Sequence, residues 1–243
     1  MKKIFVRGFL TFALLVLLFS PAPGQTVDEV LKKMIEAQGG PEVFKSIKDM
    51  TATGSINLTQ QGMSGLLTVY KKEPDKRRVD VEMMGMLITQ SYDGRVAWWT
   101  NPQTGSTEEL SGQKADDLKR QALPIIANLE PTKYGLSYVL KGKEAVEGKE
   151  YFIIEESFLD GLRVTLYVDP ETYLTSKSKA KIPGAGGAEI EIEQVSSDFR
   201  KEGEMMIAHA IITYQNGAEY SQITIKEAKF NTGLEDSLFV MSK

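Results

Sequence analysis

The chain has 243 residues, a formal net charge of −4, one histidine and no cysteine. Its hydrophobic and charged fractions, 42% and 26%, indicate a globular protein rather than a disordered or membrane-embedded one. The acidic balance argues against a nucleic-acid-binding protein, and the lack of cysteine means that a hydrophobic core rather than disulfides must hold the fold.

Residues 1–24 have the pattern of a secretory signal peptide. Two lysines follow the first methionine, residues 9–19 are apolar, and small residues precede the expected cleavage site after Gly24. A retained membrane anchor is the alternative, although the apolar run is short for a bilayer crossing, which needs about 20 residues. We expect cleavage, export, and one domain over residues 25–243.

The start of this domain predicts two helices. Thr26 with Glu29 three residues later forms a capping box, and a Gly-Gly pair ends the helix before Pro41 opens a shorter one. Apolar residues at helical spacing give the first helix one apolar stripe, formed by Val27, Val30, Leu31, Met34 and Ile35.

From residue 50 the pattern changes to alternation, which is typical of strands with one buried face. Asp93-Gly94 predicts a tight hairpin turn. Residues 113–129 return to helical spacing, and Pro124 interrupts them because proline lacks an amide hydrogen and clashes with the preceding turn. We expect two short helices or one kinked helix here. The strands expected before this insert span residues 50–59, 63–72, 76–84, 86–92 and 94–100.

Strands resume after the insert. Asp169 before a proline predicts a type I turn, since proline fixes φ and aspartate bonds the backbone beyond it. The turn at Asp160-Gly161 admits two or three residues, and the two choices turn opposite faces of the preceding strand inward. The sequence therefore leaves the facing of Glu155 and Glu156 open, with either of them a candidate for the inward side. These later strands span residues 134–141, 149–158, 161–168, 173–182, 188–199, 205–215 and 219–230.

One strand pairing follows from charge. Three lysines alternate over residues 177–181 and three glutamates over residues 189–193. Pairing Lys179 with Glu191 sets every lysine opposite a glutamate, and each such pair contributes roughly 0.2–1 kcal/mol. The charged ladder then marks the solvent side, and the buried side carries Ala180, Ile182, Ile190 and Ile192.

The pattern as a whole predicts one mostly β (α+β) domain. About a dozen strands must curl or stack to bury their inner face, and only an N-terminal helix and a central helical insert are available to cover it. Catalytic groups are scarce, because His209 is the only histidine and no G-x-S-x-G segment occurs. We expect no enzyme active site, no metal and no cofactor.

The segment 93–102, DGRVAWWTNP, resembles the Asp-Gly-x-x-x-Trp-x-x-Asn-Pro segment of LolA-type proteins, which are bacterial periplasmic lipoprotein carriers. Residues 73–78 are similar to that family's proline turn, and residues 167–174 to its late hairpin. The resemblance implies a strongly curved antiparallel sheet forming an incomplete barrel, with the helices covering its concave face. It implies a periplasmic carrier for lipid or lipoprotein acyl chains rather than an enzyme.

The implied partners are acyl chains, an inner-membrane donor and an outer-membrane acceptor protein, with no nucleic acid. The alternative within the same fold is an envelope-sensing or protein-interaction module without carrier activity. The family's lipid-anchored relatives need a lipidated cysteine, which this chain lacks.

The expected ligand cavity follows from alternation and from the resemblance. Trp98 and Trp99 are neighbours on a strand and must face opposite ways, so either one lines the cavity or fills the core. Methionines in adjacent strands suit varied acyl chains, and equally suit core filling. The family's cavity arginine has Arg78 as its nearest candidate and Arg77 as a rival. The expected cavity residues are Trp98, Met84, Met86, Leu166, Ile190, Ile192 and Arg78. The expected lid residues are Val30, Leu31, Met34, Leu118, Ile125 and Ile126.

Overall fold

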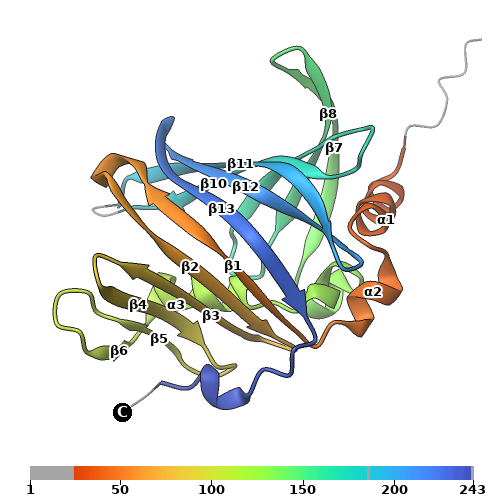
Figure 1. Ribbon diagram of the computed structural model, residues 1–243. Coiled ribbons are helices and arrows are strands. Elements are labelled where there is room, and N and C mark those ends of the chain that lie inside the picture. The colour runs from red at the N-terminus through yellow and green to blue at the C-terminus, as the bar shows by residue number, and fades with distance from the viewer. Residues whose placement is uncertain (1–24, 185–186, 242–243) are drawn as a thin grey trace, which may run out of the picture.

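The computed structural model describes residues 25–184 and 187–241, so the expected signal peptide lies outside the described residues. A single antiparallel sheet of 13 strands dominates the chain, with a few short helices beside it (Figure 1). The prediction of a mostly β fold with an N-terminal helix and a central helical insert is therefore confirmed. No helix within these residues is long and apolar enough to cross a membrane.

The sheet follows the chain almost without crossovers. Each strand pairs with its neighbours in sequence, except that β6 and β7 do not pair with each other, and the pairing of β1 with β13 joins the two halves. β6 and β7 form the two edges of the sheet, which is open. The strands are β1 (Asp49–Leu58), β2 (Met63–Lys72), β3 (Lys76–Met83), β4 (Met86–Tyr92), β5 (Ala97–Thr100), β6 (Thr107–Glu109), β7 (Ser137–Val146), β8 (Lys149–Ser157), β9 (Arg163–Val168), β10 (Thr175–Pro183), β11 (Glu189–Glu202), β12 (Met205–Gln215) and β13 (Ala218–Phe230).

The helices lie where the sequence predicts them. α1 (Val27–Ala37) begins with the expected capping box of Thr26 and Glu29, and α2 (Pro41–Ser46) has its proline in the first turn. The central insert is broken at its proline into α3 (Gly112–Gln121) and the 3₁₀ turn η2 (Ile125–Asn128). Further 3₁₀ turns are η1 (Thr59–Gln61), η3 (Pro131–Tyr134) and η5 (Asp236–Leu238).

The strands differ from the prediction in several places. β5 begins only at Ala97, because the carboxylate of Asp93 accepts the backbone N–H groups of Arg95 and Val96 and holds them in the turn. β7 begins at Ser137 because the preceding residues form η3. β6 was not predicted, since three residues are too few to show alternation.

The charged hairpin of β10 and β11 has the predicted faces but a register shifted by two residues. Lys179 lies opposite Glu193 rather than Glu191, because a hydrogen bond from Gly184 N to Ala188 O closes a shorter turn. A shift of two keeps every side chain on its face, so the predicted buried residues stay together, with Ala180 now opposite Ile192 instead of Ile190. The lysines reach their partners partly diagonally: Lys177 and Lys179 both contact Glu193, at 3.2 and 2.8 Å, and Lys181 contacts Glu189 at 3.5 Å.

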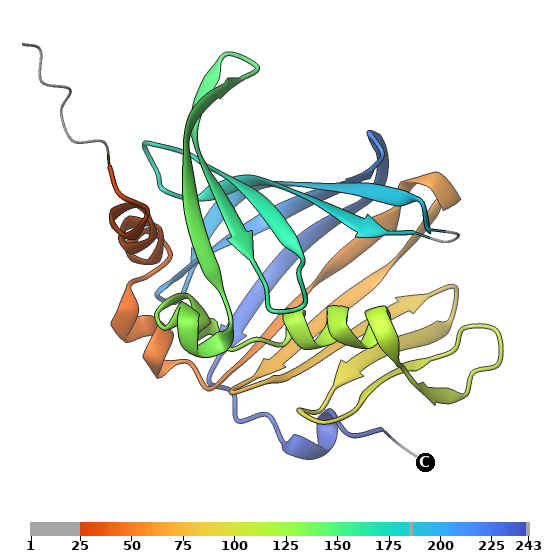
Figure 2. The ribbon, with the colours of Figure 1, turned by 180° about the vertical axis from the view of Figure 1, so that it is seen from behind.

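The two faces of the sheet differ in their cover. The interior face carries an apolar layer on β1, β2 and β13, centred on Ala52, Leu67 and Ile225. α1 packs beside this layer on β8 and β9, and α3 packs on β5 through Leu118 and Ala97. Figure 2 shows α3 running between the two wings of the bent sheet.

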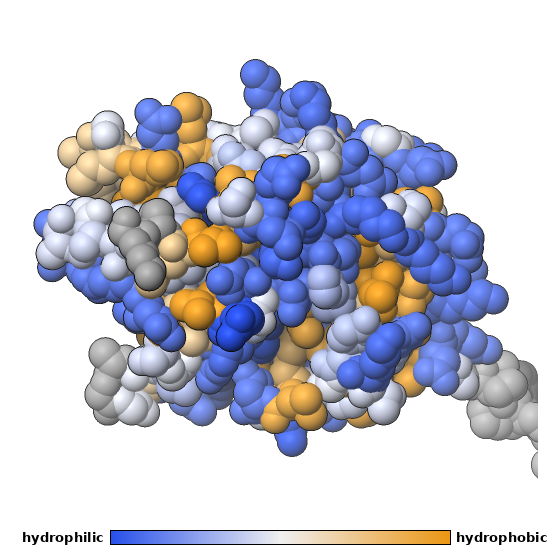
Figure 3. Space-filling view, turned by 90° about the horizontal axis from the view of Figure 1, so that it is seen from below, coloured by the Kyte–Doolittle hydropathy of each residue, from blue (hydrophilic) through white to orange (hydrophobic). Residues whose placement is uncertain are grey.

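The opposite, exterior face is covered in one place by the C-terminal tail, residues 231–241. The side chain of Phe239 is fully buried there. Arg78 donates to the carbonyl of Leu238, and the Trp98 indole donates to that of Phe239, at 2.8 Å in both cases. Seen from below, the surface is largely hydrophilic, with apolar side chains gathered in separate patches (Figure 3).

Candidate functional site

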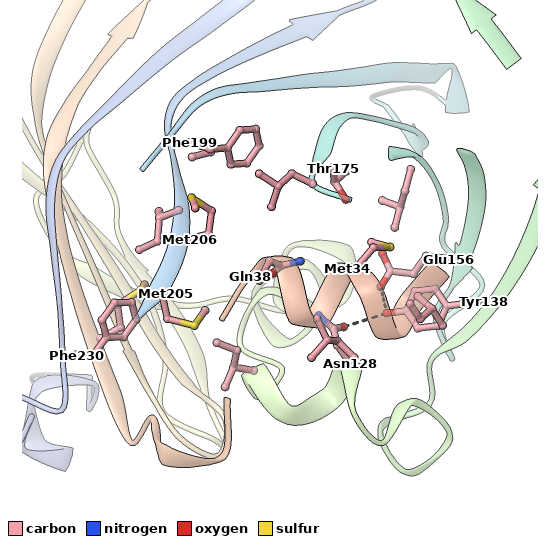
Figure 4. Close-up of a pocket in the computed structure, with 18 residues that line it drawn as sticks. Met34, Gln38, Asn128, Tyr138, Glu156, Thr175, Phe199, Met205, Met206 and Phe230 are labelled. Atoms are coloured by element: carbon pink, nitrogen blue, oxygen red, sulfur yellow. Dashed lines mark hydrogen bonds between the residues drawn. The ribbon is translucent and has the colours of Figure 1, made fainter. Parts of the chain in front are cut away.

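A mostly apolar hollow of about 420 Å³ lies on the interior face, between α1, η2 and strands β7 to β13 (Figure 4). Its volume falls within the range of roughly 300–1,000 Å³ that is usual for small-molecule sites. None of its lining residues is lysine, arginine or histidine. They are Leu31, Met34, Ile35, Gln38, Met50, Ile125, Asn128, Tyr138, Glu156, Leu166, Leu174, Thr175, Phe199, Met205, Met206, Ile207, Ala208 and Phe230.

One wall of this hollow is α1. Val30 and Met34 are buried against Phe152, Ile154 and Val168 of the sheet, which fixes the helix in place. Residues three and four apart share a helix face, so the next positions of the same stripe, among them Leu31, turn toward the hollow. The wall is therefore formed by a helix that is held in place by the packing of Val30 and Met34 on the sheet.

The opposite wall arises where β12 separates from β13. The two strands pair only from Ala210 onward, so the first part of β12 has no ladder partner on that side. The N–H of Met206 instead donates to the carbonyl of Gln38 at the end of α1, 3.1 Å away. Because the strands diverge, both faces of residues 205–208 are exposed to the hollow, together with Phe230.

The polar groups of the hollow include a short hydrogen-bonded chain. The Tyr138 hydroxyl lies 2.8 Å from Glu156 Oε1 and 3.0 Å from Asn128 Oδ1. Burial raises the pKa of Glu156, and the hydrogen bond from Tyr138 partly opposes that rise. Burial, together with the Glu156 charge, also raises the pKa of Tyr138, so its hydroxyl stays protonated.

A second hollow of about 410 Å³ lies between α3 and the interior face of β9, β10 and β11. Val164 lines this hollow, and Leu166, two residues further on the same face of β9, lines the first. The apolar floor of β9 thus extends from one hollow to the other. The remaining floor of the second hollow includes Phe158, Leu162, Ala180, Ile182 and Ile192.

The helical insert is tied to the sheet on both sides of its proline. Lys71 Nζ donates to the carbonyl of Leu123 at 2.5 Å, and a Glu73 carboxylate oxygen accepts the N–H of Ile125 at 3.0 Å. Burial lowers the pKa of Lys71 to about 8 and raises that of Glu73. Arg120 of α3 also pairs with Asp160 in the β8–β9 turn.

The structure brings part of the predicted site together. Leu166 and the lid residues Leu31, Met34 and Ile125 line the first hollow, and Ile192 lines the second. The other three predicted lid residues line neither hollow. Val30 and Leu118 pack against the sheet, and Ile126 packs beside α2. Ile190 is half-buried on the interior face, opposite Ile182.

Two of the predicted cavity residues lie on the exterior face instead. Trp98 and Arg78 contact the C-terminal tail, and the buried Trp98 ring is 6.0 Å from the Arg78 guanidinium carbon. Strand alternation places the neighbouring Ala97 and Arg77 on the interior face. Of the two candidate cavity arginines, Arg77 is therefore the interior one. Burial lowers its pKa to about 10, and its guanidinium pairs with no other described residue.

Met84 and Met86 do not line a cavity either. Met86 opens β4 opposite Met83 and is 47% exposed, and Met84 lies in the turn between β3 and β4 and is 77% exposed. Alternation placed Met86 in its strand correctly, but β3 ends at Met83, one residue before Met84.

The sequence pattern did not identify Tyr138, Asn128 or the ties of Lys71 and Glu73 to the insert. It left the facing of Glu156 open. A three-residue turn at residues 159–161 sets Glu156 opposite Val164 on the inside and leaves Glu155 outside. The hydrogen bond between Tyr138 and Glu156 joins residues 18 positions apart, which no local sequence pattern contains.

His209 is buried in the structure. Its Nδ1 lies 2.9 Å from the carbonyl oxygen of Ile225, and its Nε2 lies 3.2 Å from Glu202 Oε1. Across residues 25–184 and 187–241 there is no group of three or more His, Asp or Glu side chains placed to hold a metal ion.

Comparison with solved structures shows the fold. A LolA superfamily protein from Nitrosomonas europaea is similar with a TM-score of 0.61 and 16% identity, over 89% of this chain and 98% of that one. A putative outer membrane lipoprotein-sorting protein domain from Vibrio parahaemolyticus is similar with a TM-score of 0.59 and 15% identity, over 87% and 94%. A DUF1329 family protein from Desulfovibrio piger is similar with a TM-score of 0.61 and 13% identity, over 89% and 98%.

No protein-family model matches the sequence, and no curated protein matches it. At these identities the structural likeness is one of fold. The chain thus has the LolA-type fold that its three sequence segments predict.

Proposed function

We propose that this protein, with its LolA-type fold, is a periplasmic carrier or binding protein for the acyl chains of lipids or lipoproteins. The observation that carries the proposal is the first hollow: a cavity of about 420 Å³, lined mostly by aliphatic, aromatic and methionine side chains and by no cation. Contact between water and such an apolar surface is unfavourable. Each square ångström of apolar area that a ligand buries there contributes about 25 cal/mol to the binding free energy.

The bent sheet acts in this proposal as an incomplete barrel, with α1 and the α3–η2 insert as its cover. The second hollow extends the apolar floor along β9, so a chain longer than the first hollow has a continuous surface to follow. The ties at Lys71 and Glu73 hold the insert against the sheet on either side of its proline, which keeps this part of the cover in place over the cavity.

Location and partners follow from the same proposal. Removal of residues 1–24 releases residues 25–243 as one domain outside the inner membrane. The similar fold of a putative lipoprotein-sorting domain supports lipoprotein acyl chains as cargo, with a donor at the inner membrane and an acceptor at the outer membrane. No catalytic step is part of the proposal.

A titration tests the proposal. Delipidated residues 25–243 are titrated with a monoacylglycerol by calorimetry and by displacement of a fluorescent acyl probe. The probe is needed because neither tryptophan lines the first hollow. We expect saturable uptake with a negative heat-capacity change, the signature of apolar burial.

Two variants locate the uptake. Phe199→Glu places a charge in the wall of the hollow and should weaken binding at least about tenfold, because desolvating an unpaired carboxylate costs more than the 1.4 kcal/mol that a factor of ten represents. Met84→Glu changes an exposed turn and should bind like wild type. Absence of saturable uptake by the wild type would contradict the carrier function and favour a protein-interaction module of the same fold.

A further inference from the structure

The first hollow has a polar end and an apolar end. Figure 4 shows Tyr138, Glu156 and Asn128 together on one side, while Met205 and Phe230 lie on the other. The polar end comes from β7, β8 and η2, and the apolar end from the parting of β12 and β13. A ligand with one polar and one apolar end therefore has a preferred orientation in this cavity.

The polar end offers the acceptor oxygens of Glu156 and Asn128, beside the amide NH2 group of Asn128. The Tyr138 hydroxyl has one proton, so it donates to Glu156 or to Asn128 but not fully to both. With the proton on the side of Glu156, the carboxylate still has unused lone pairs, and it forms no ion pair with any residue in the described part of the chain. An ionised carboxylate accepts hydrogen bonds and donates none.

No cation offsets this acidic group inside the hollow. Lys71 and Arg77 lie on the interior face, and Arg120 lines the second hollow, but none of them lines the first. Lys71 is also engaged with the carbonyl of Leu123. A ligand carboxylate at the polar end would therefore face Glu156 across a poorly solvated space, where like charges repel strongly.

We propose that Glu156, positioned by Tyr138 and Asn128, is a specificity-determining residue that selects acyl ligands whose polar end donates hydrogen bonds. Hydroxyl, amide N–H and ammonium groups satisfy the free acceptor sites, and the acyl chain then extends toward Met205 and Phe230. Ligands that end in a carboxylate are excluded. This inference rests on the proposed function and narrows the class of its ligand.

Three ligands of equal chain length separate the possibilities: a monoacylglycerol, which donates; a fatty acid methyl ester, which is neutral and only accepts; and the free fatty acid, which is anionic. Binding to delipidated residues 25–243 at neutral pH is measured by probe displacement. We expect the monoacylglycerol to bind tightest and the fatty acid weakest, with at least about a tenfold difference, the size of a charged hydrogen bond.

Glu156→Gln supplies a donor and removes the charge at nearly constant shape. We expect it to reduce the preference for monoacylglycerol over fatty acid at least about fivefold, since the repulsion is lost. Glu155→Gln is the matched control, because that neighbour lies on the exterior face, where its carboxylate pairs with Lys141 at 3.2 Å. It should leave the order of the three ligands unchanged.

The results distinguish this inference from the proposed function. Saturable binding of all three ligands with equal affinity, or tightest binding of the fatty acid, overturns the headgroup selection and leaves the carrier function standing. Failure of every ligand to bind overturns both. The affinities of the three ligands for the wild-type protein are enough to test the headgroup selection. The test therefore does not depend on whether the Glu156→Gln variant folds.

Discussion

The carboxylate of Asp169 closes the turn between β9 and β10 and is almost excluded from water. It accepts the N–H groups of Glu171 and Thr172, at 2.8 and 3.0 Å, and contacts Lys149 Nζ at 2.5 Å. Burial alone would raise its pKa, but these hydrogen bonds outweigh burial and hold the pKa at about 2. The sequence predicted this turn because aspartate before proline bonds the backbone beyond it.

Asp169→Asn should lower the free energy of unfolding at pH 7 by about 1–2 kcal/mol, since it weakens charge-assisted hydrogen bonds. The folded pKa lies below the unfolded value of about 3.9, so this stabilisation is complete above that value and is lost as the pH falls toward 2. Urea unfolding at pH 7 and pH 3 checks it. The difference in the free energy of unfolding between wild type and variant should be smaller at pH 3 than at pH 7. A larger difference at pH 3 would contradict a lowered pKa of Asp169 in the folded protein.

Single residues also show where sequence reasoning stops. Alternation states that Trp98 and Ala97 face opposite ways, but not which way is inward. A large aromatic side chain is ordinarily expected inside. Here the C-terminal tail covers the exterior face, so Trp98 is buried there, while small Ala97 makes room for Leu118 of α3. The deciding contact joins residues 141 positions apart, which no local pattern contains.

At the scale of elements, the C-terminal tail crosses the exterior face of the sheet and is fixed to it at both ends. The carboxylate of Asp49 accepts hydrogen bonds from the backbone of Thr232, Gly233 and Leu234, which anchors the start of the tail. Phe239 anchors its end in a fully buried position. The surface that receives the tail could not be predicted from the sequence, because the contacts of the tail join residues far apart in the chain.

Phe239→Ala should destabilise the protein by about 3–5 kcal/mol, the usual cost of emptying a buried phenylalanine site. The neighbouring Val240 is 52% exposed, so Val240→Ala should stay within about 0.5 kcal/mol of wild type. Denaturant unfolding measures both losses as shifts of the midpoint, and the slopes of the two unfolding transitions should stay unchanged. Equal, small losses would mean that the tail is not packed in solution.

Most elements could be predicted because their signals are local. The capping box at Thr26, the break at Pro124 and the Asp-Gly hairpin each depend on a few neighbouring residues. Register is less local. The hairpin of β10 and β11 has the predicted faces, yet its pairing is shifted by two because the length of its turn decides the register. A one-residue bulge in β7 likewise has no sequence signature beyond Gly142.

At the scale of the whole molecule, the fold depends on the pairing of β1 with β13, which joins the first and last thirds of the chain. The fold class was predictable, since so many strands and so few helices leave few ways to bury an inner face. The cavity was predictable only in outline. Its two walls come from α1 and from the parting of β12 and β13, and that parting is a property of the assembled sheet.

The central claim is that this cavity holds acyl chains, and native mass spectrometry of the protein purified from envelope extract tests it most directly. We predict adducts whose masses match acylated molecules, which are released by organic extraction and depleted in Phe199→Glu but retained in Met84→Glu. Wild-type protein that carries no acylated molecule, and takes up none when a monoacylglycerol is supplied, would contradict the claim.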